Sequence, residues 1–181
     1  MTSTVLITGC SSGIGAATVR HFAAQGWNVA ATLRDPAAAH FEDSAGKVAS
    51  FALDVTDPQS VDAAVAQAVE RFGHIDVLIN NAGYGLFGPF ETATQEVIER
   101  QFQTNVFGVF AVTRAVLPHM RERAGGVIIH VASLTGLVAM PLYSLYAASK
   151  FAVVGFSESL SHELAPLGIR VNTIVPGPTN T

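Results

Sequence analysis

Short runs of apolar residues recur along the chain, and longer segments with a helical period separate them. Six of these runs predict strands, at residues 5–7, 27–33, 48–53, 75–79, 125–132 and 169–175. Most of the runs are apolar throughout, which is typical of strands that are buried on both faces of a parallel sheet. The pattern therefore predicts a parallel sheet that helices cover on both sides.

The segments between these runs predict helices over 16–25, 57–72, 94–121 and 147–164, with a short helix near 36–39. The clearest is 57–72, where the apolar residues recur at i, i+3, i+4, i+7, i+8 and i+11 from Val61. Asp57 followed by Pro58 predicts its start. The helix over 94–121 is expected to have a joint near Asn105. Strand and helix alternate six times, so we expect one doubly wound α/β domain over 1–181.

Composition narrows the classes of protein. Hydrophobic residues make up 49% and charged residues 13%, which indicates a globular chain with a sizeable core. The net charge of −4 leaves no basic stripe for a nucleic acid. The single Cys10 excludes an internal disulfide and fits a reducing compartment. We see no signal peptide, and no apolar stretch approaches the ~20 residues that span a membrane, so we expect a cytoplasmic protein.

A glycine-rich turn joins the first strand to the first helix, with the sequence Thr-Gly-Cys-Ser-Ser-Gly-Ile-Gly at 8–15. Its spacing is GxxxGxG and differs from the commoner GxGxxG. A strand–turn–helix of this kind lets backbone amides approach a pyrophosphate, whose charge the helix N-terminus favours. Cys10 lies in this turn, where a helix N-terminus can lower the pKa of a thiol. We interpret it as a small filler of the turn.

Tyr146 and Lys150 lie four residues apart in a predicted helix, so their side chains share one face. A free tyrosine has a pKa of about 10, and a nearby cation lowers that value by favouring the phenolate. The spacing is therefore typical of an acid/base pair, although many surface helices carry it by chance. Other features of the chain must decide between the two interpretations.

Several motifs arrive together in one order: Gly9, Gly13 and Gly15; Asp54 and Val55; Asn80, Asn81, Ala82 and Gly83; Asn105; Ser133; Tyr146 and Lys150; Pro176 and Gly177. In these motifs the chain resembles the short-chain dehydrogenase/reductase family over residues 5–181. The resemblance implies a Rossmann fold and hydride transfer between a nicotinamide cofactor and a carbonyl compound or secondary alcohol. Members of this branch usually continue further, with a substrate-covering segment and a last strand, so the chain looks incomplete after Thr181.

The resemblance also implies the catalytic roles. Tyr146 would exchange a proton with the substrate oxygen, and Lys150 would lower the pKa of the tyrosine and bind the nicotinamide ribose. Ser133 would hydrogen-bond the reacting oxygen. Asn105 would hold a water molecule that connects Lys150 to a proton path.

The implied cofactor contacts come from turns that follow strands. They comprise Gly9, Ser11, Ser12, Gly13, Ile14, Gly15, Arg34, Asp54, Val55, Asn81, Ala82, Gly83, Tyr146, Lys150, Pro176, Gly177 and Thr181. Asp54 would accept a hydrogen bond from the adenine amino group. Asn80 is expected to tie strand ends together and not to touch the cofactor.

The end of the second strand bears on the choice between NAD and NADP. An acidic residue there would bind the ribose 2′-hydroxyl, but this chain has Leu33 followed by Arg34. A guanidinium suits a phosphate, so we expect a preference for NADP(H), with NAD(H) possible. A shift of one residue would place Asp35 nearby and favour NAD(H).

Apolar residues crowd the loops that follow the strand ends, and they predict a hydrophobic carbonyl or alcohol substrate. These residues are Tyr84, Phe87, Phe90, Leu134, Leu137, Val138, Met140, Leu142 and Tyr143. The short sequences at 8–15, 31–37 and 81–85 resemble those of family members that act on steroids or retinoids.

None of the histidines has metal-site spacing, and we expect structural or solvated roles for them, including His130 within the fifth strand. The helix faces at 94–121 and 146–165 are those with which the family forms dimers or tetramers.

Two other functions stay open. A binding or regulatory protein of the same fold would do no chemistry, but such proteins typically lack Ser133, Tyr146 or Lys150. A sugar-nucleotide epimerase or dehydratase shares the Tyr-x-x-x-Lys spacing, but it has a different glycine spacing and a longer C-terminal domain.

Overall fold

The computed structural model describes residues 2–41 and 46–179. Its strands are β1 (Thr4–Thr8), β2 (Asn28–Leu33), β3 (Val48–Ala52), β4 (Val77–Asn80), β5 (Gly126–Val131) and β6 (Ile169–Ile174). Its longer helices are α1 (Gly13–Ala24), α2 (Pro58–Phe72), α3 (Gln95–Phe102), α4 (Gly108–Glu122) and α5 (Ser144–Leu164). Every predicted strand and long helix is present, so the predicted alternation of strand and helix is confirmed.

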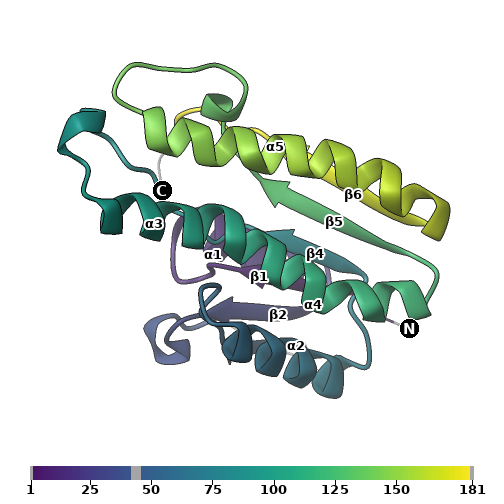
Figure 1. Ribbon diagram of the computed structural model, residues 1–181. Helices are drawn as coiled ribbons and strands as arrows, with labels where there is room; N and C mark the ends of the chain where they lie inside the picture. Colours follow the sequence, from purple (N-terminus) through teal and green to yellow (C-terminus); the bar gives the residue numbers. More distant parts are fainter. Residues whose placement is uncertain (1, 42–45, 180–181) are drawn as a thin grey trace.

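The strands form one parallel sheet in the order β3-β2-β1-β4-β5-β6. From β1 the chain moves outward to β3, and it then returns to place β4 on the other side of β1 (Figure 1). The strand order thus reverses between β1 and β4. In sheets of this kind, ligands bind outside the carboxyl ends of the strands at such a reversal.

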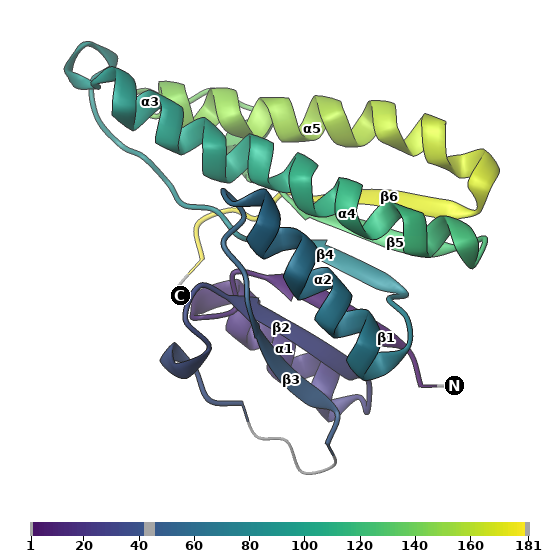
Figure 2. The same cartoon turned by 60° about the horizontal axis from the view of Figure 1, so that its bottom comes forward.

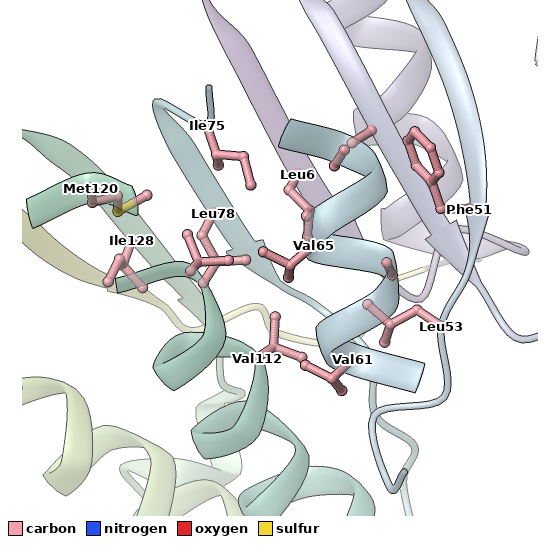
Figure 3. Close-up of a cluster of buried hydrophobic side chains, with 14 of the residues drawn as sticks. Leu6, Phe51, Leu53, Val61, Val65, Ile75, Leu78, Val112, Met120 and Ile128 are labelled. Carbon is pink, nitrogen blue, oxygen red and sulfur yellow. The ribbon is translucent and has the colours of Figure 1, made fainter. Parts of the chain in front are cut away.

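The helices are unequally divided between the two faces of the sheet. Helices α2, α4 and α5 lie on one face and α1 lies on the other (Figures 1 and 2). The larger core fills the space under α2 and α4, where Leu6 and Leu78 of the sheet meet Val65 and Val112 of the helices (Figure 3). A smaller core packs α1 against the opposite face.

Helices lie on both faces of the sheet, as predicted, but the described residues leave one side of β6 exposed. On the α1 side of β6, the side chains of Arg170, Asn172 and Ile174 are exposed, and among the described residues no helix packs over them. On the opposite side, Ile169 is buried beneath α5. The continuous apolar run predicted that both faces of β6 are buried, but buried and exposed side chains alternate along it. Its apolar residues are Ile169, Val171 and Ile174, and they do not all point to the same face.

Local signals account for the helix boundaries. Asp57 caps α2 by accepting a hydrogen bond from the backbone N–H of Gln59 at 3.0 Å, and Gly73 ends the helix in a left-handed conformation. The predicted joint near Asn105 is a π-helical turn, Gln103–Phe107, between α3 and α4. Among the described residues, no helix combines the length and the apolar surface that a membrane span needs.

Candidate active site

A cleft of about 650 Å³ opens at the carboxyl ends of the strands. Residues that follow all six strands line it, including Gly9 after β1, Ala82 after β4 and Ser133 after β5. Its volume lies within the range of about 300–1,000 Å³ that is usual for small-molecule sites. The cleft therefore occupies the position that the reversal of strand order predicts.

The glycine-rich turn forms the cleft wall between β1 and α1. A side chain at Gly9, where φ is +71°, would place its Cβ 2.8 Å from the Cα of Ala82, so the turn lies against the end of β4. A Cβ on Gly15 would collide with the carbonyl oxygen of Gly9. Ser12 precedes α1 without capping it through its side chain. The first N–H groups of this 12-residue helix thus remain available to a phosphate.

Tyr146 and Lys150 both line the cleft, and the ammonium nitrogen of Lys150 lies 5.7 Å from the centre of the Tyr146 ring. That nitrogen donates a 2.8 Å hydrogen bond to the carbonyl oxygen of Val131. Burial lowers the pKa of Lys150 to about 8. No carboxylate of residues 2–41 or 46–179 forms an ion pair with it. Since an ammonium has three donors, two remain for a ligand in the cleft.

Ser133 lies on the loop after β5 and lines the same cleft. Its Oγ accepts hydrogen bonds from the backbone N–H and the hydroxyl of Thr135, at 3.2 and 3.0 Å. With its acceptor positions used in this way, the Ser133 hydroxyl can donate its own hydrogen. The Ser133 hydroxyl is therefore available as a donor at the cleft.

Asn105 is almost fully buried in the π-helical turn, and its side chain does not line the cleft. It accepts a hydrogen bond from the backbone N–H of Tyr84 at 3.1 Å and donates to the carbonyl of Tyr84 at 2.9 Å. It also donates to the hydroxyl of Ser149 at 3.2 Å. The side chain thus fixes the loop after β4 against α5. That Asn105 holds a water molecule stays a prediction.

The residues after β2 and β3 lie at the far end of the cleft. One carboxylate oxygen of Asp54 accepts hydrogen bonds from the N–H and the hydroxyl of Thr56, at 2.9 and 2.7 Å. These bonds are the main cause of the lowered pKa of Asp54, and the charge of Arg34 contributes. Arg34 lines the cleft, whereas the carboxylate of Asp35 caps a short helix at Ala37 and does not line it.

Of the two asparagines at the end of β4, the one that ties strand ends together is not the predicted one. Asn81, not Asn80, ties strand ends together, because its side chain donates to the carbonyls of Thr8 and Gly9 at 2.9 and 3.1 Å. Asn80 points to the other side of the sheet and donates to the hydroxyl of Thr113 in α4 at 2.9 Å. The backbone beside Asn81 still lines the cleft.

Most predicted site residues gather around the cleft. Those that line it are Gly9, Ser11, Ser12, Gly13, Ile14, Arg34, Asp54, Val55, Asn81, Ala82, Gly83, Ser133, Tyr146, Lys150, Pro176 and Gly177. Gly15 and Asn105 lie behind the lining, and Thr181 falls outside the described residues. Their contacts with a cofactor stay predictions.

Several residues that sequence reasoning missed also help to build the cleft. Thr56, Arg100 and Thr104 line it. Gly136 lets the loop after β5 approach α5, since a Cβ there would lie 2.9 Å from the carbonyl oxygen of Lys150. A glycine three residues after Ser133 was the available signal for this close approach.

A second, apolar hollow of about 160 Å³ lies beside the cleft. Leu86, Phe87 and Phe90 line one side of it, and Leu142 and Leu145 line the other. The two loops are joined by a 2.9 Å hydrogen bond between the N–H of Gly88 and the carbonyl of Leu142. Gly85 and Tyr146, which line the main cleft, directly neighbour Leu86 and Leu145 in the chain. A cavity of this size accommodates a group as large as benzene.

Cys10 agrees with the interpretation as a filler of the turn. Its side chain is fully buried, and its thiol donates to the carbonyl of Ile7 at 3.1 Å. Burial raises its pKa to about 12. Among the described residues, no three His, Cys, Asp or Glu side chains are grouped so that they could hold a metal ion.

Comparisons with known proteins agree with this geometry. The family model described as short chain dehydrogenase matches residues 3–181. The chain is 44% identical over 177 residues to a 3-ketodihydrosphingosine reductase of Bacteroides thetaiotaomicron, covering 98% of the chain and 64% of that protein. It is 41% identical over 185 residues to retinol dehydrogenase 8 of Bos taurus, covering 98% of the chain and 59% of that protein. The chain thus spans about three fifths of the length of these curated relatives.

Solved structures with bound dinucleotides share the fold. The structure of ElxO with NADP bound superposes with a TM-score of 0.91 and 32% identity, covering 98% of this chain and 74% of that one. The 3-ketoacyl-(acyl-carrier-protein) reductase from Brucella melitensis, complexed with NADH, superposes with a TM-score of 0.91 and 36% identity, covering 97% and 75%.

Proposed function

The chain belongs to the short-chain dehydrogenase family, and on this premise we propose that it transfers a hydride between NADP(H) and a carbonyl compound or secondary alcohol. The observation that carries the proposal is the convergence of Tyr146, Lys150 and Ser133 on one cleft at the reversal of strand order. The bound nicotinamide would supply or accept the hydride. The protein would supply the proton and hold the reacting oxygen.

In the reducing direction, the substrate oxygen lies between the hydroxyls of Tyr146 and Ser133. The proton moves from the Tyr146 hydroxyl to that oxygen while the carbonyl carbon gains the hydride. Lys150 stabilises the phenolate that remains, since its ammonium lies beside the ring and meets no carboxylate of the described chain. Its two remaining donors suit the hydroxyls of a ribose.

The cofactor would lie along the cleft, with its pyrophosphate at the glycine-rich turn. The uncapped start of α1 and the close approach of Gly9 to Ala82 both fit such a group. Asp54 keeps one carboxylate oxygen outside its bonds to Thr56, and that oxygen can accept from the adenine amino group.

Preference for NADP(H) is favoured by the residues after β2. Arg34 lines the cleft and can bind a 2′-phosphate, whereas Asp35 is engaged in its cap and its carboxylate is directed elsewhere. The test is kcat/KM with both cofactors for the wild type and Arg34→Ala. A clear preference for NAD, or unchanged use of NADP by Arg34→Ala, would contradict this choice.

The substrate would be apolar. The hollow between the loops at 86–93 and 142–145 neighbours the cleft and has room for a ring or a short alkyl segment. Two relatives carry names of enzymes for long, apolar substrates, a ketodihydrosphingosine and a retinol. NADPH oxidation with a panel of ketones of increasing chain length tests this. Turnover confined to small polar ketones would exclude it.

A homo-oligomer would use the outer faces of α4 and α5. Phe107 and Phe151 are about half exposed there. Gly155, in the middle of α5, has nothing within 4 Å of where its Cβ would lie, so no contact inside the described chain requires a glycine. A close approach from another subunit would require one. Light scattering of wild type and Phe151→Glu tests this, with monomers expected only for the variant.

The catalytically silent alternative makes a different prediction, namely dinucleotide binding without turnover of any ketone. NADPH oxidation by the wild type beside Tyr146→Phe separates the two, because only an enzyme loses turnover on this change. The cytoplasmic location stays a prediction.

A further inference from the structure

A chain of four buried polar side chains lies behind the cleft and takes no part in the proposed chemistry. Asn80 of β4, Thr113 of α4, His130 of β5 and Ser157 of α5 are each at most 3% exposed. Asn80 lies 2.9 Å from Thr113, Thr113 lies 3.4 Å from His130 Nε2, and His130 Nδ1 lies 2.6 Å from Ser157. None of the four lines the cleft.

The donors in this chain all point the same way. The Ser157 hydroxyl donates its only hydrogen to the carbonyl of Val153 at 2.6 Å, so Nδ1 of His130 must donate to Ser157. Nε2 is then the acceptor, and it can receive the hydrogen of Thr113, whose oxygen accepts from Asn80. The neutral imidazole satisfies every link, and burial lowers its pKa to about 4.

Three of the four links belong to elements that carry or lead directly into a group that lines the cleft. His130 precedes Ser133 by three residues in the chain, and Ser157 follows Lys150 by seven, which is two helical turns. Asn80 directly precedes the run at 81–83 that lines the cleft. The carbonyl that accepts from Lys150 belongs to Val131, the neighbour of His130. The ring of His130 also stacks on Phe156 of α5, with centroids 5.5 Å apart.

We propose that His130 is a positioning residue that, through its bond to Ser157, fixes how α5 lies along β5 and so sets Tyr146 and Lys150 against Ser133. This inference rests on the proposed function. A directional hydrogen bond between buried partners has one preferred arrangement, whereas apolar side chains can slide past one another. A displacement of about 1 Å at reacting groups can cost ~10²-fold in rate. His130 itself touches neither substrate nor cofactor.

The test compares His130→Phe, which keeps a ring for stacking, with Ser157→Ala and the double variant. Ser161→Ala is the matched control, because Ser161 makes a similar 2.7 Å bond within α5 but on its exposed side. We expect each single variant to lower kcat about 10-fold while the Kd for NADPH changes less than about 2-fold. The kcat of the double variant should fall no further than that of the less active single variant, because both changes break the same link.

A second measurement needs no turnover. The chain has only two lysines, Lys47 and Lys150, so NMR of lysine labelled at Cε follows Lys150 directly, with Lys47→Arg for assignment. We expect the titration midpoint of Lys150 to rise from about 8 toward 10.5 in His130→Phe and Ser157→Ala, because loosened packing admits water. Ser161→Ala should leave it unchanged. His130→Asn, which can place an amide N–H near the position of Nδ1, should restore most of the kcat.

These measurements separate the two proposals. Wild-type kcat together with an unmoved Lys150 midpoint in the folded His130→Phe and Ser157→Ala variants would overturn the positioning role. Proportional losses of kcat and NADPH affinity would also overturn it, since they would indicate general destabilisation. If none of the ketones in the panel supports oxidation of NADPH by the wild type, the proposed function fails. The titration midpoint of Lys150 still decides whether His130 positions the site. If His130→Phe does not fold, Ser157→Ala and Thr113→Val provide the same comparison.

Discussion

Lys150 of α5 and His130 of β5 are two buried basic side chains, and Lys150 bonds to Val131, the residue after His130. Burial shifts the pKa of each by a similar amount. The pKa of Lys150 falls from 10.5 to about 8, and that of His130 falls from 6.5 to about 4. Near neutral pH the consequences differ: Lys150 stays about ten to one in its charged form, and His130 is neutral. The cleft thus contains a charged side chain, whereas the polar side chains behind the cleft include a neutral imidazole.

The difference lies in what surrounds each group. His130 has partners for both ring nitrogens, so the neutral form is fully satisfied. Lys150 has one protein acceptor, the carbonyl of Val131, and no carboxylate partner in the described chain. A buried cation without a partner destabilises the fold, so its presence in the cleft points to a use beyond stability.

Tyr146→Phe should abolish the chemistry of the cleft and leave the hydrogen-bonded side chains from Asn80 to Ser157 behind it intact. It removes only the hydroxyl, so we expect kcat to fall by about 10³-fold. The Kd for NADPH should stay within about 2-fold, because the ring is retained. Steady-state rates of NADPH oxidation measure kcat, and fluorescence titration measures the Kd. Substantial residual turnover would show that the proton comes from another group.

Lys150→Met should separate activity from stability. We expect kcat/KM to fall by about 10²-fold, since the phenolate loses its cation. The free energy of unfolding should rise by about 1–2 kcal/mol near neutral pH, because the charged form of a buried lysine is the costly one. Urea unfolding at constant pH measures this. A loss of stability would mean that Lys150 stabilises the fold and would contradict this prediction.

His130 predicts an acid-labile fold. Its folded pKa of about 4 lies below the unfolded value of 6.5, so the unfolded chain binds the proton more tightly between these values. The stability contribution is complete above pH 6.5 and is lost as the pH falls to 4, and it amounts to about 3 kcal/mol. Urea unfolding across this window should show a steeper loss in the wild type than in His130→Phe. Parallel curves would contradict a neutral, buried His130.

The sequence predicted the sheet, the glycine-rich turn and most of the cleft, because each has a local pattern. The apolar runs mark the strands, and Gly9 and Gly15 mark places where backbones must touch. The family resemblance placed Asp54, Ser133 and Pro176 in one site, and these residues lie together because residues that follow parallel strands meet at one edge.

The sequence could not predict the partners of buried polar groups. His130 is visible only as a polar residue within an apolar strand, and Ser157 lies 27 residues away with no pattern that connects them. The strand-tying role was assigned to Asn80 instead of Asn81 for the same reason, since neighbouring residues of a strand point to opposite faces and the partner on each face is remote. The exposed side of β6 was missed because its apolar composition does not reveal which face is covered.

Cys10 provides a control for the contrast between Lys150 and His130. It lies in the turn beside the cleft, and a helix N-terminus there would lower the pKa of an accessible thiol. Burial outweighs this influence and raises the pKa to about 12, so the reactive thiolate is scarce at neutral pH. We expect folded protein to react with a thiol reagent about 10³-fold more slowly than unfolded protein, and Cys10→Ala to retain turnover within about 2-fold. Rapid modification of the folded protein, slowed by NADPH, would instead place the thiol in the working site. Slow modification is the expected result, because the thiol of Cys10 is buried and bonded to Ile7, whereas Lys150 keeps two donors without a protein acceptor in the described chain.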